Sequence, residues 1–354
     1  MIEVTWNENS LTRDMMVYLE NQVKINLSSS GLGLSLFLGI GAVYVCYYLS
    51  TVAKKPQLIT GSATLSEFLR RYCPVVTETF YPTFWCWESR VQTLLTPLII
   101  TKPWVEYRNE LIKAADGGHI SLDWSNNDDN TLYPVSATRP TILILPGLTG
   151  TSKESYVLHM VKQSERLGYR CVVLNNRGVS GERLLTPRTY CAANTEDLEM
   201  AILHIQNAFP EAPLMAAGAS MGGHRQILNK LFNIDYIMKA KTIREFDERF
   251  TSVMFGYKTN VDYYRDASPS HKLKSIEVPV LCLNALDDVF SPAYAIPMQS
   301  AKQNPNVALL LTAHGGHIGF LEGIFPRQMT YMDRIFKQFI QAIVEHKDEL
   351  NITH

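Results

Sequence analysis

The sequence predicts an α/β protein whose sheet is largely parallel and covered by helices on both faces. From residue 106 onward, short apolar runs alternate with helical runs, which is typical of parallel strands joined by crossover helices. The 354 residues are 46% hydrophobic and 19% charged, enough for a sizeable core in one large unit. The net charge of -1 leaves no basic excess, which argues against nucleic acid as a partner.

The predicted elements follow in chain order. A hairpin is indicated around Asp116, Gly117 and Gly118, between two strand-like runs. Later strands are expected at 141–145, 171–175, 213–218, 278–285 and 307–312, and helices around 153–167 and 195–208. The last helix has apolar residues at three- and four-residue spacing: Met332, Ile335, Phe336, Phe339, Ile340 and Ile343. About sixty residues between the strands at 213–218 and 278–285 contain no convincing strand.

Residues 31–53 predict a transmembrane helix. The stretch is uncharged, and as a helix it covers about 34 Å, more than the bilayer core of about 30 Å. A signal-peptide core and a buried soluble helix are the alternatives. The signal peptide is disfavoured because about thirty residues precede the stretch, four of them acidic, and because the apolar run is long.

The sequence indicates less clearly on which side of the membrane the bulk of the chain lies. Four basic residues, Lys54, Lys55, Arg70 and Arg71, follow the span, whereas Arg13 and Lys24 precede it. The positive-inside tendency therefore favours the cytosol for the bulk of the chain, but the small margin leaves the side undecided.

The sequence divides into four parts. We expect an N-terminal segment at 1–30, the span at 31–53, a juxtamembrane region rich in aromatic residues and proline at 54–105, and the α/β domain at 106–348, with a shortened cap-like helical insert at 224–275. The aromatic stretch at 72–87 could line an acyl-chain entrance, lie at the membrane interface or pack under the main domain.

The six cysteines do not indicate a metal site. They fall at 46, 73, 86, 171, 191 and 282, without a CxxC pair or close Cys/His spacing. Cys171 and Cys282 lie in apolar strand-like runs, where a small buried side chain is the expected role.

A nucleophilic serine is indicated at Ser220. Gly218-Ala219-Ser220-Met221-Gly222 fits G-x-S-x-G and directly follows an apolar strand. In such a turn the serine backbone is strained, and side chains at the two glycines are expected to collide with the neighbouring strand and helix. The motif alone is weak, but its place after a strand strengthens the prediction.

Acyl transfer also needs donors for a developing oxyanion. The N–H of Met221 is one candidate, and the loop "LPGLTG" at 145–150 offers the N–H of Leu148 as the second. Gly147 lets this loop turn tightly, although a plain glycine turn is an equally good interpretation.

The base and its acid are expected later in the chain, in the order Asp then His. "NALDDVFSP" offers Asp287 and Asp288, and we prefer Asp287 for its spacing from the strand end. "AHGGHIGF" offers His314 and His317, and we prefer His317 because two glycines precede it. Ser220 would then attack an ester carbonyl, His317 would transfer the proton and Asp287 would orient the imidazole, with no cofactor required.

Seven stretches together resemble the α/β-hydrolases, and more closely their membrane-anchored branch related to YheT-type esterases. These stretches are "CPVVTETFYPTFWCWE", "LPGLTGTSKESY", "NNRGVSGERLLTPRTYCAANTEDLE", "GASMGG", "REFDERFTSVMFGY", "LCLNALDDVFSP" and "GGHIGFLEGIFPRQ". The resemblance implies an α/β-hydrolase fold, a single-pass anchor in the endoplasmic reticulum or another endomembrane, and cleavage of glycerophospholipid acyl esters, chiefly of phosphatidylcholine. It also implies the bilayer and its phospholipids as partners, and a triad at Ser220, Asp287 and His317.

The chain departs from that family after Gly223. Family members continue with a long apolar helix and another strand, whereas this chain passes directly to "HRQILNKLFNIDYIMKAK", which resembles a cap segment. We therefore expect the fold to lack one strand and one helix. If the flanking strands paired directly, the Asp287 end would shift by about 5 Å, against a catalytic tolerance of about 0.5 Å. Unless another segment fills the gap, this predicts a disturbed triad. Two alternatives stay open, an inactive or weakly active membrane protein and an esterase or thioesterase for small substrates.

Overall fold

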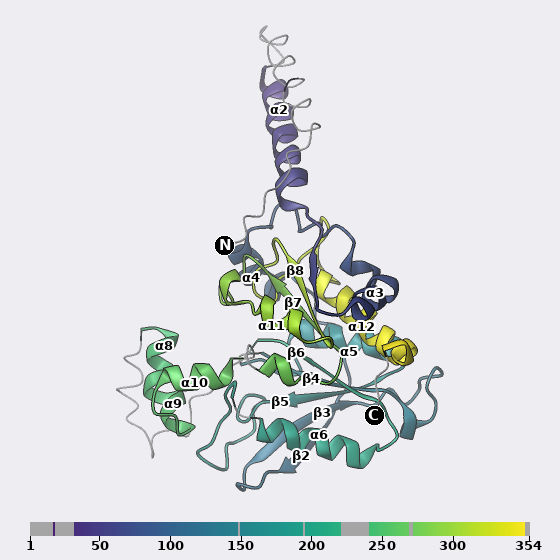
Figure 1. Ribbon diagram of the computed structural model, residues 1–354, viewed down its shortest axis with the longest axis vertical. Helices are drawn as coiled ribbons and strands as arrows, with labels where there is room; N and C mark the ends of the chain where they lie inside the picture. The colour runs from purple at the N-terminus through teal and green to yellow at the C-terminus, as the bar shows by residue number, and fades with distance from the viewer. Residues whose placement is uncertain are drawn as a thin grey trace.

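The computed structural model describes residues 17, 32–147, 149–193, 195–220, 241–268 and 272–350. In this part of the chain a long helix projects from a body in which helices flank the strands on both sides (Figure 1). The predicted α/β class is therefore confirmed, but the sheets are mixed rather than largely parallel in the described residues, with three antiparallel and three parallel strand pairs.

Five strands form the larger sheet, in the order β2-β3-β5-β4-β6. Their bounds are Arg108–Lys113 for β2, His119–Ser125 for β3, Arg170–Asn175 for β5, Thr141–Leu145 for β4 and Leu214–Gly218 for β6. β2, β3 and β5 pair antiparallel, whereas β5, β4 and β6 pair in parallel. The predicted hairpin and the predicted strands of this sheet are present.

Three strands form the smaller sheet, in the order β1-β8-β7. β7 (Val280–Ala285) and β8 (Val307–Thr312) pair in parallel, and β1 (Gln57–Ile59) pairs antiparallel with β8. β6 and β7 lie at the edges of their respective sheets, and no pairing joins them within the described residues. This break lies where the missing strand is expected.

The helices of the main body cover these sheets. Their bounds are Ala63–Tyr72 for α3, Ser89–Ile99 for α4, Ser155–Arg166 for α5, Glu196–Ala208 for α6, Met298–Gln303 for α11 and Tyr331–His346 for α12. A group of short helices, α8 (Ile243–Phe246), α9 (Ser252–Met254) and α10 (Asn260–Ala267), lies within the expected cap-like insert. The role of this insert as a cap stays a prediction.

The C-terminal helix α12 packs against both sheets through two apolar faces. Ile335 belongs to the core of the three-stranded sheet, whereas Phe336 and Ile340 pack with β4, β5 and α5 of the other sheet. A reciprocal pair of hydrogen bonds between Thr330 and Asp333 caps its first turn. The helix thus joins two sheets that share no strand pairing in the described chain.

The apolar helix α2 (Leu32–Tyr47) continues as a π-helical turn, Tyr48–Val52. Residues 35–52 are long and apolar enough to cross a membrane, and only 11% of this window is buried. The base of α2 is bound to the body, because Tyr48 donates to the carbonyl of Pro82 at 2.6 Å and Tyr44 donates to that of Phe84. α2 is the one such helix in the described residues.

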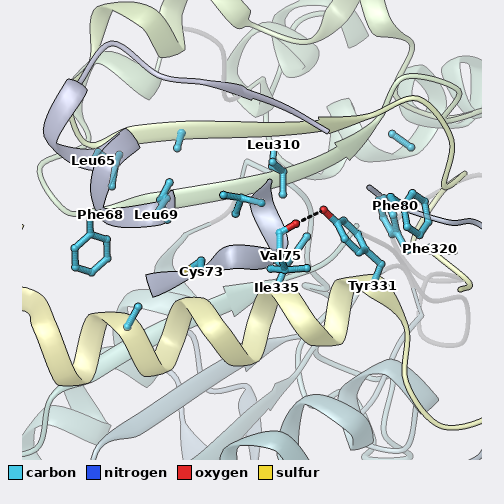
Figure 2. Close-up of a cluster of buried hydrophobic side chains, with 14 residues drawn as sticks. Leu65, Phe68, Leu69, Cys73, Val75, Phe80, Leu310, Phe320, Tyr331 and Ile335 are labelled. Atoms are coloured by element: carbon cyan, nitrogen blue, oxygen red, sulfur yellow. Dashed lines mark hydrogen bonds between the residues drawn. The ribbon is translucent and has the colours of Figure 1, made fainter. Parts of the chain in front are cut away.

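The first part of the juxtamembrane region is core of the domain. Leu69, Cys73 and Val75 pack with Leu310 of β8 and with α12, as Figure 2 shows. The Tyr331 hydroxyl donates to the carbonyl of Val75 at 2.9 Å. Of the alternatives for the stretch at 72–87, ordinary packing under the main domain therefore applies to its beginning.

Substitution of Leu69 tests this packing. Leu69 is fully buried, so Leu69→Ala should lower the free energy of unfolding by about 2 to 5 kcal/mol through lost contacts and a cavity. Leu203 on α6 is 52% exposed, and Leu203→Ala should change it by no more than about 0.5 kcal/mol. Denaturant unfolding of both variants measures the difference, and equal values would show that residues 63–80 are not part of the core.

Candidate active site

Ser220 lies at the end of β6, in a sharp turn. The Ala219 N–H donates to the carbonyl of Leu145 at 3.1 Å, so the pairing with β4 continues to the residue before the serine. Ser220 itself has φ of 32°, in the left-handed region that non-glycine residues seldom adopt. Ser220 is exposed and follows β6, the edge strand of the five-stranded sheet. This is the strained, accessible turn that a nucleophilic serine requires.

Gly147 fits closely against this turn. A Cβ at this position would lie 2.9 Å from the Ala219 carbonyl oxygen and 3.1 Å from Ser220 Cβ, so a side chain is excluded. The Gly147 N–H donates to the Tyr156 hydroxyl at 2.8 Å, which ties the loop to α5. The loop expected to supply an oxyanion donor is therefore packed against the serine.

Gly218 does not meet the same steric limit. A Cβ there would lie 3.7 Å from that of Leu145, an ordinary contact, so the expected collision with a neighbouring strand is wrong for the described residues. Met221 and Leu148, the two expected oxyanion donors, lie outside the described residues, as does Gly222. Their roles stay predictions.

His317 lies between the serine and a carboxylate. Its Nε2 is 2.6 Å from Ser220 Oγ, and its Nδ1 is 2.9 Å from Asp288 Oδ2. The carboxylate accepts from Nδ1–H, which leaves Nε2 free to accept the serine proton. The Phe290 ring packs against the imidazole in a T-shaped arrangement, with ring centroids 4.9 Å apart, and the backbone N–H of His317 donates to Thr93 Oγ1 at 2.9 Å.

Asp288 is built to stay ionised. Its side chain is only 7% exposed, and this burial opposes ionisation. The hydrogen bonds from His317 and from the N–H groups of Phe290 and Ser291 outweigh burial and lower the pKa of Asp288 below its ordinary value. The carboxylate is therefore negative when His317 becomes an imidazolium.

Asp287, the acid that the sequence analysis prefers, does not contact His317. Its Oδ2 lies 3.0 Å from Nδ1 of His314, and its Oδ1 accepts from the Gly316 N–H at 3.0 Å. The preference for Asp287 is thus corrected to Asp288. The turn directs two adjacent carboxylates to different histidines, a choice that spacing along the chain cannot make.

Asp287 instead holds the loop that carries His317. Gly316 has φ of 61°, and a Cβ on it would lie 2.4 Å from the Ser89 carbonyl oxygen. This glycine is therefore needed where the loop crosses the start of α4. His314 is also in contact with Trp87, with ring centroids 5.2 Å apart.

The expected disturbance of the site is not present. Ser220 comes from the five-stranded sheet, whereas Asp288 and His317 follow β7 and β8 of the other sheet, yet the two hydrogen bonds of His317 join them. The expectation assumed that β6 and β7 would close the gap by pairing. No pairing joins them in the described residues, so the assumption behind the expected one-strand shift is not met.

Sequence reasoning missed Thr93 and Trp87. Thr93 fixes the backbone of His317 from α4, and Trp87 packs on His314. Trp87 lies in one of the stretches that resemble the family, but nothing in the sequence links it to His314, and Thr93 belongs to no motif. In the described part of the chain, no group of three or more His, Cys, Asp or Glu residues could hold a metal ion.

Comparisons with known proteins identify close relatives. No family model matches the chain. It is 57% identical to phospholipase ABHD3 of Homo sapiens, with 96% of this chain and 98% of the relative covered. It is 56% identical to the Mus musculus phospholipase ABHD3, covering 96% and 97%. Among solved structures, the Pyrococcus furiosus esterase Pf2001 matches at 16% identity and a TM-score of 0.44, covering 70% of this chain and 97% of the esterase.

The human alignment also bears on the expected missing block. It runs over 399 residues, 45 more than the 354 residues of this chain. The relative therefore has at least that many residues without a counterpart here. The predicted α/β-hydrolase fold is confirmed, and the chain belongs to the ABHD3 phospholipase family of α/β-hydrolases, enzymes that hydrolyse ester bonds.

Proposed function

We propose that this chain is a membrane-anchored serine hydrolase that cleaves acyl esters of phosphatidylcholine-type glycerophospholipids through Ser220, His317 and Asp288. The observation that carries the proposal is the position of His317, within hydrogen-bond distance of both the serine and the carboxylate. The relatives named phospholipase ABHD3 support a phospholipid as the substrate.

The first half-reaction forms an acyl-enzyme. Ser220 Oγ attacks the ester carbonyl carbon while its proton passes to His317 Nε2, and the ionised Asp288 stabilises the imidazolium. The tetrahedral intermediate then collapses, and His317 returns the proton to the leaving alcohol, the lysophospholipid. Water attacks the acyl-enzyme by the same route and releases the fatty acid.

The oxyanion donors are proposed to be the N–H groups of Leu148 and Met221. The close approach of Gly147 to Ser220 supports this role for the loop, because it brings the described part of the loop against the serine turn. The exposed apolar surface of α2 supports the anchor, with a signal sequence as the alternative origin of the helix.

Labelling of the serine separates a live enzyme from an inactive relative. The full chain in membranes should react covalently with a fluorophosphonate probe, because His317 activates Ser220, and Ser220→Ala should abolish the reaction. The assembled hydrogen bonds favour this outcome over an inactive protein. A folded parent that takes up no label would contradict the proposal.

The two adjacent aspartates can be separated by matched substitutions. Asp288→Asn should lower kcat on a soluble ester by about 10⁴-fold, because the amide no longer selects the required imidazole tautomer. Asp287→Asn only weakens the support of the histidine loop, so its loss should stay within about 100-fold. A larger loss in Asp287→Asn than in Asp288→Asn would return the role of acid to Asp287.

The substrate class is tested by comparing two esters. The parent should hydrolyse both phosphatidylcholine in vesicles and a soluble short-chain ester, since the anchor holds the site at the bilayer. Product analysis by mass spectrometry measures both reactions, with Ser220→Ala as the control. Hydrolysis of the soluble ester alone would favour the small-ester or thioesterase alternative.

A further inference from the structure

The helix α4 has its polar and apolar faces reversed. Gln92 and Thr96 face inward, with exposures of 0% and 8%, whereas Leu94 and Leu98 face outward, with exposures of 70% and 79%. Val91 is exposed on the same outer side. A helix on the surface of a water-soluble domain normally buries its apolar stripe. The outer face of α4 therefore calls for an apolar environment.

The inward polar face has a clear structural reason. Gln92 accepts from the Leu321 N–H at 2.9 Å, and Thr93 accepts from the His317 N–H at 2.9 Å. α4 is thus fixed to the loop that carries the catalytic histidine. Polar residues are needed on that side, but they do not account for leucines on the other.

The exposed apolar residues of α4 continue onto two neighbouring segments. Trp85 donates from its indole N–H to the carbonyl of Ile324 at 2.8 Å, and the Thr101 N–H donates to the carbonyl of Arg327 at 2.8 Å. These bonds hold the loop around residue 325 along α4. We define the apolar surface by its exposed members: Phe84, Trp85, Val91, Leu94, Leu98, Ile324 and Phe325.

This apolar surface adjoins the base of α2. Tyr44 of α2 donates to the carbonyl of Phe84, and the Trp87 indole donates to the Tyr44 hydroxyl at 3.2 Å. α4 lies in the part of the body from which α2 projects, whereas α6 lies at the far end (Figure 1). A bilayer entered by α2 would therefore meet the apolar surface at its interface.

We propose that the apolar surface inserts into the interface of the same phospholipid bilayer that α2 enters. Tyr and Trp side chains near the base of α2 are of the kind that favours the headgroup region, and Arg90 beside the leucines can reach lipid phosphates. The surface thus holds the His317 loop at the membrane, where an acyl ester can enter the site. This inference rests on the proposed function, because it assumes the anchor and a lipid substrate.

An environment-sensitive label tests the contact without any catalysis. In the full chain reconstituted in phosphatidylcholine vesicles, a nitrobenzoxadiazole label on Leu98→Cys should emit to the blue of its position in water and be quenched by nitroxide-bearing lipids. The same label on Leu203→Cys should do neither. The native cysteines are buried or half-buried, so the introduced thiol is labelled preferentially.

Activity provides the second measurement. The double variant Leu94→Gln, Leu98→Gln should hydrolyse phosphatidylcholine vesicles about 10-fold more slowly, because less apolar surface enters the bilayer. Its hydrolysis of a soluble ester should stay within about 2-fold of the parent, because these side chains are exposed and outside the triad. Leu203→Gln, on α6, is the matched control for both substrates.

Two results would overturn the inference. One is a label on Leu98→Cys that keeps its emission in water after reconstitution. The other is a blue shift that grows with protein density and is insensitive to lipid nitroxides, which would assign the surface to a second copy of the chain. A parent that hydrolyses neither ester would instead refute the proposed function, and the label would still report on the membrane contact.

Discussion

The packing of α12 against both sheets is the interaction on which the active site depends. No strand pairing connects β6 with β7 in the described chain, so hydrogen bonds of a common sheet cannot set their separation. Ile335 packs with the three-stranded sheet, and Phe336 and Ile340 pack with the five-stranded one. Apolar packing of this kind is dense and tolerates little displacement. It therefore fixes the position of one sheet relative to the other, so that His317 lies within hydrogen-bond distance of Ser220.

Each of the two sheets keeps the residues that position its part of the site. The neighbours that shape the serine turn, Leu145 and Gly147, precede the point at which the chain departs from its family. The groups that place His317 are Asp288, which follows β7, and Thr93, which belongs to the juxtamembrane region. The block expected to be missing after Gly223 would therefore contain none of the side chains that orient Ser220 and His317 here. This explains why a shortened chain can keep the hydrogen bonds of the site.

The sequence predicts the buried elements of this fold well. β4 and β8 have the predicted bounds, because continuous apolar runs bounded by turns leave little choice of structure. The order of Ser220 and His317 after their strands also follows from the chain alone. The orientation of α4 cannot be predicted from its apolar residues in this way, because they face outward and its inward face is polar. β1 has only three residues and depends on its partner β8.

The choice between two adjacent aspartates marks the limit of sequence reasoning at the site. Asp287 and Asp288 follow the same strand, and each binds a histidine of the same loop. Which one meets His317 depends on the backbone angles of the turn. The Asp288 carboxylate accepts from the N–H of Phe290, two residues on, which is an Asx turn and a pattern that could have favoured it.

The short connection between α2 and the body would limit how the enzyme meets its substrate if α2 is the membrane anchor proposed above. Lys54 and Phe80 form a backbone bridge directly after the helix, and Tyr48 is bonded to Pro82, so no slack linker separates α2 from the domain. With α2 in a bilayer, as proposed, a site held in this way would meet only the lipids of that bilayer. Its turnover would follow the number of ester lipids per unit area of its own leaflet, so dilution of those lipids with inert ones would slow the reaction even at constant total lipid.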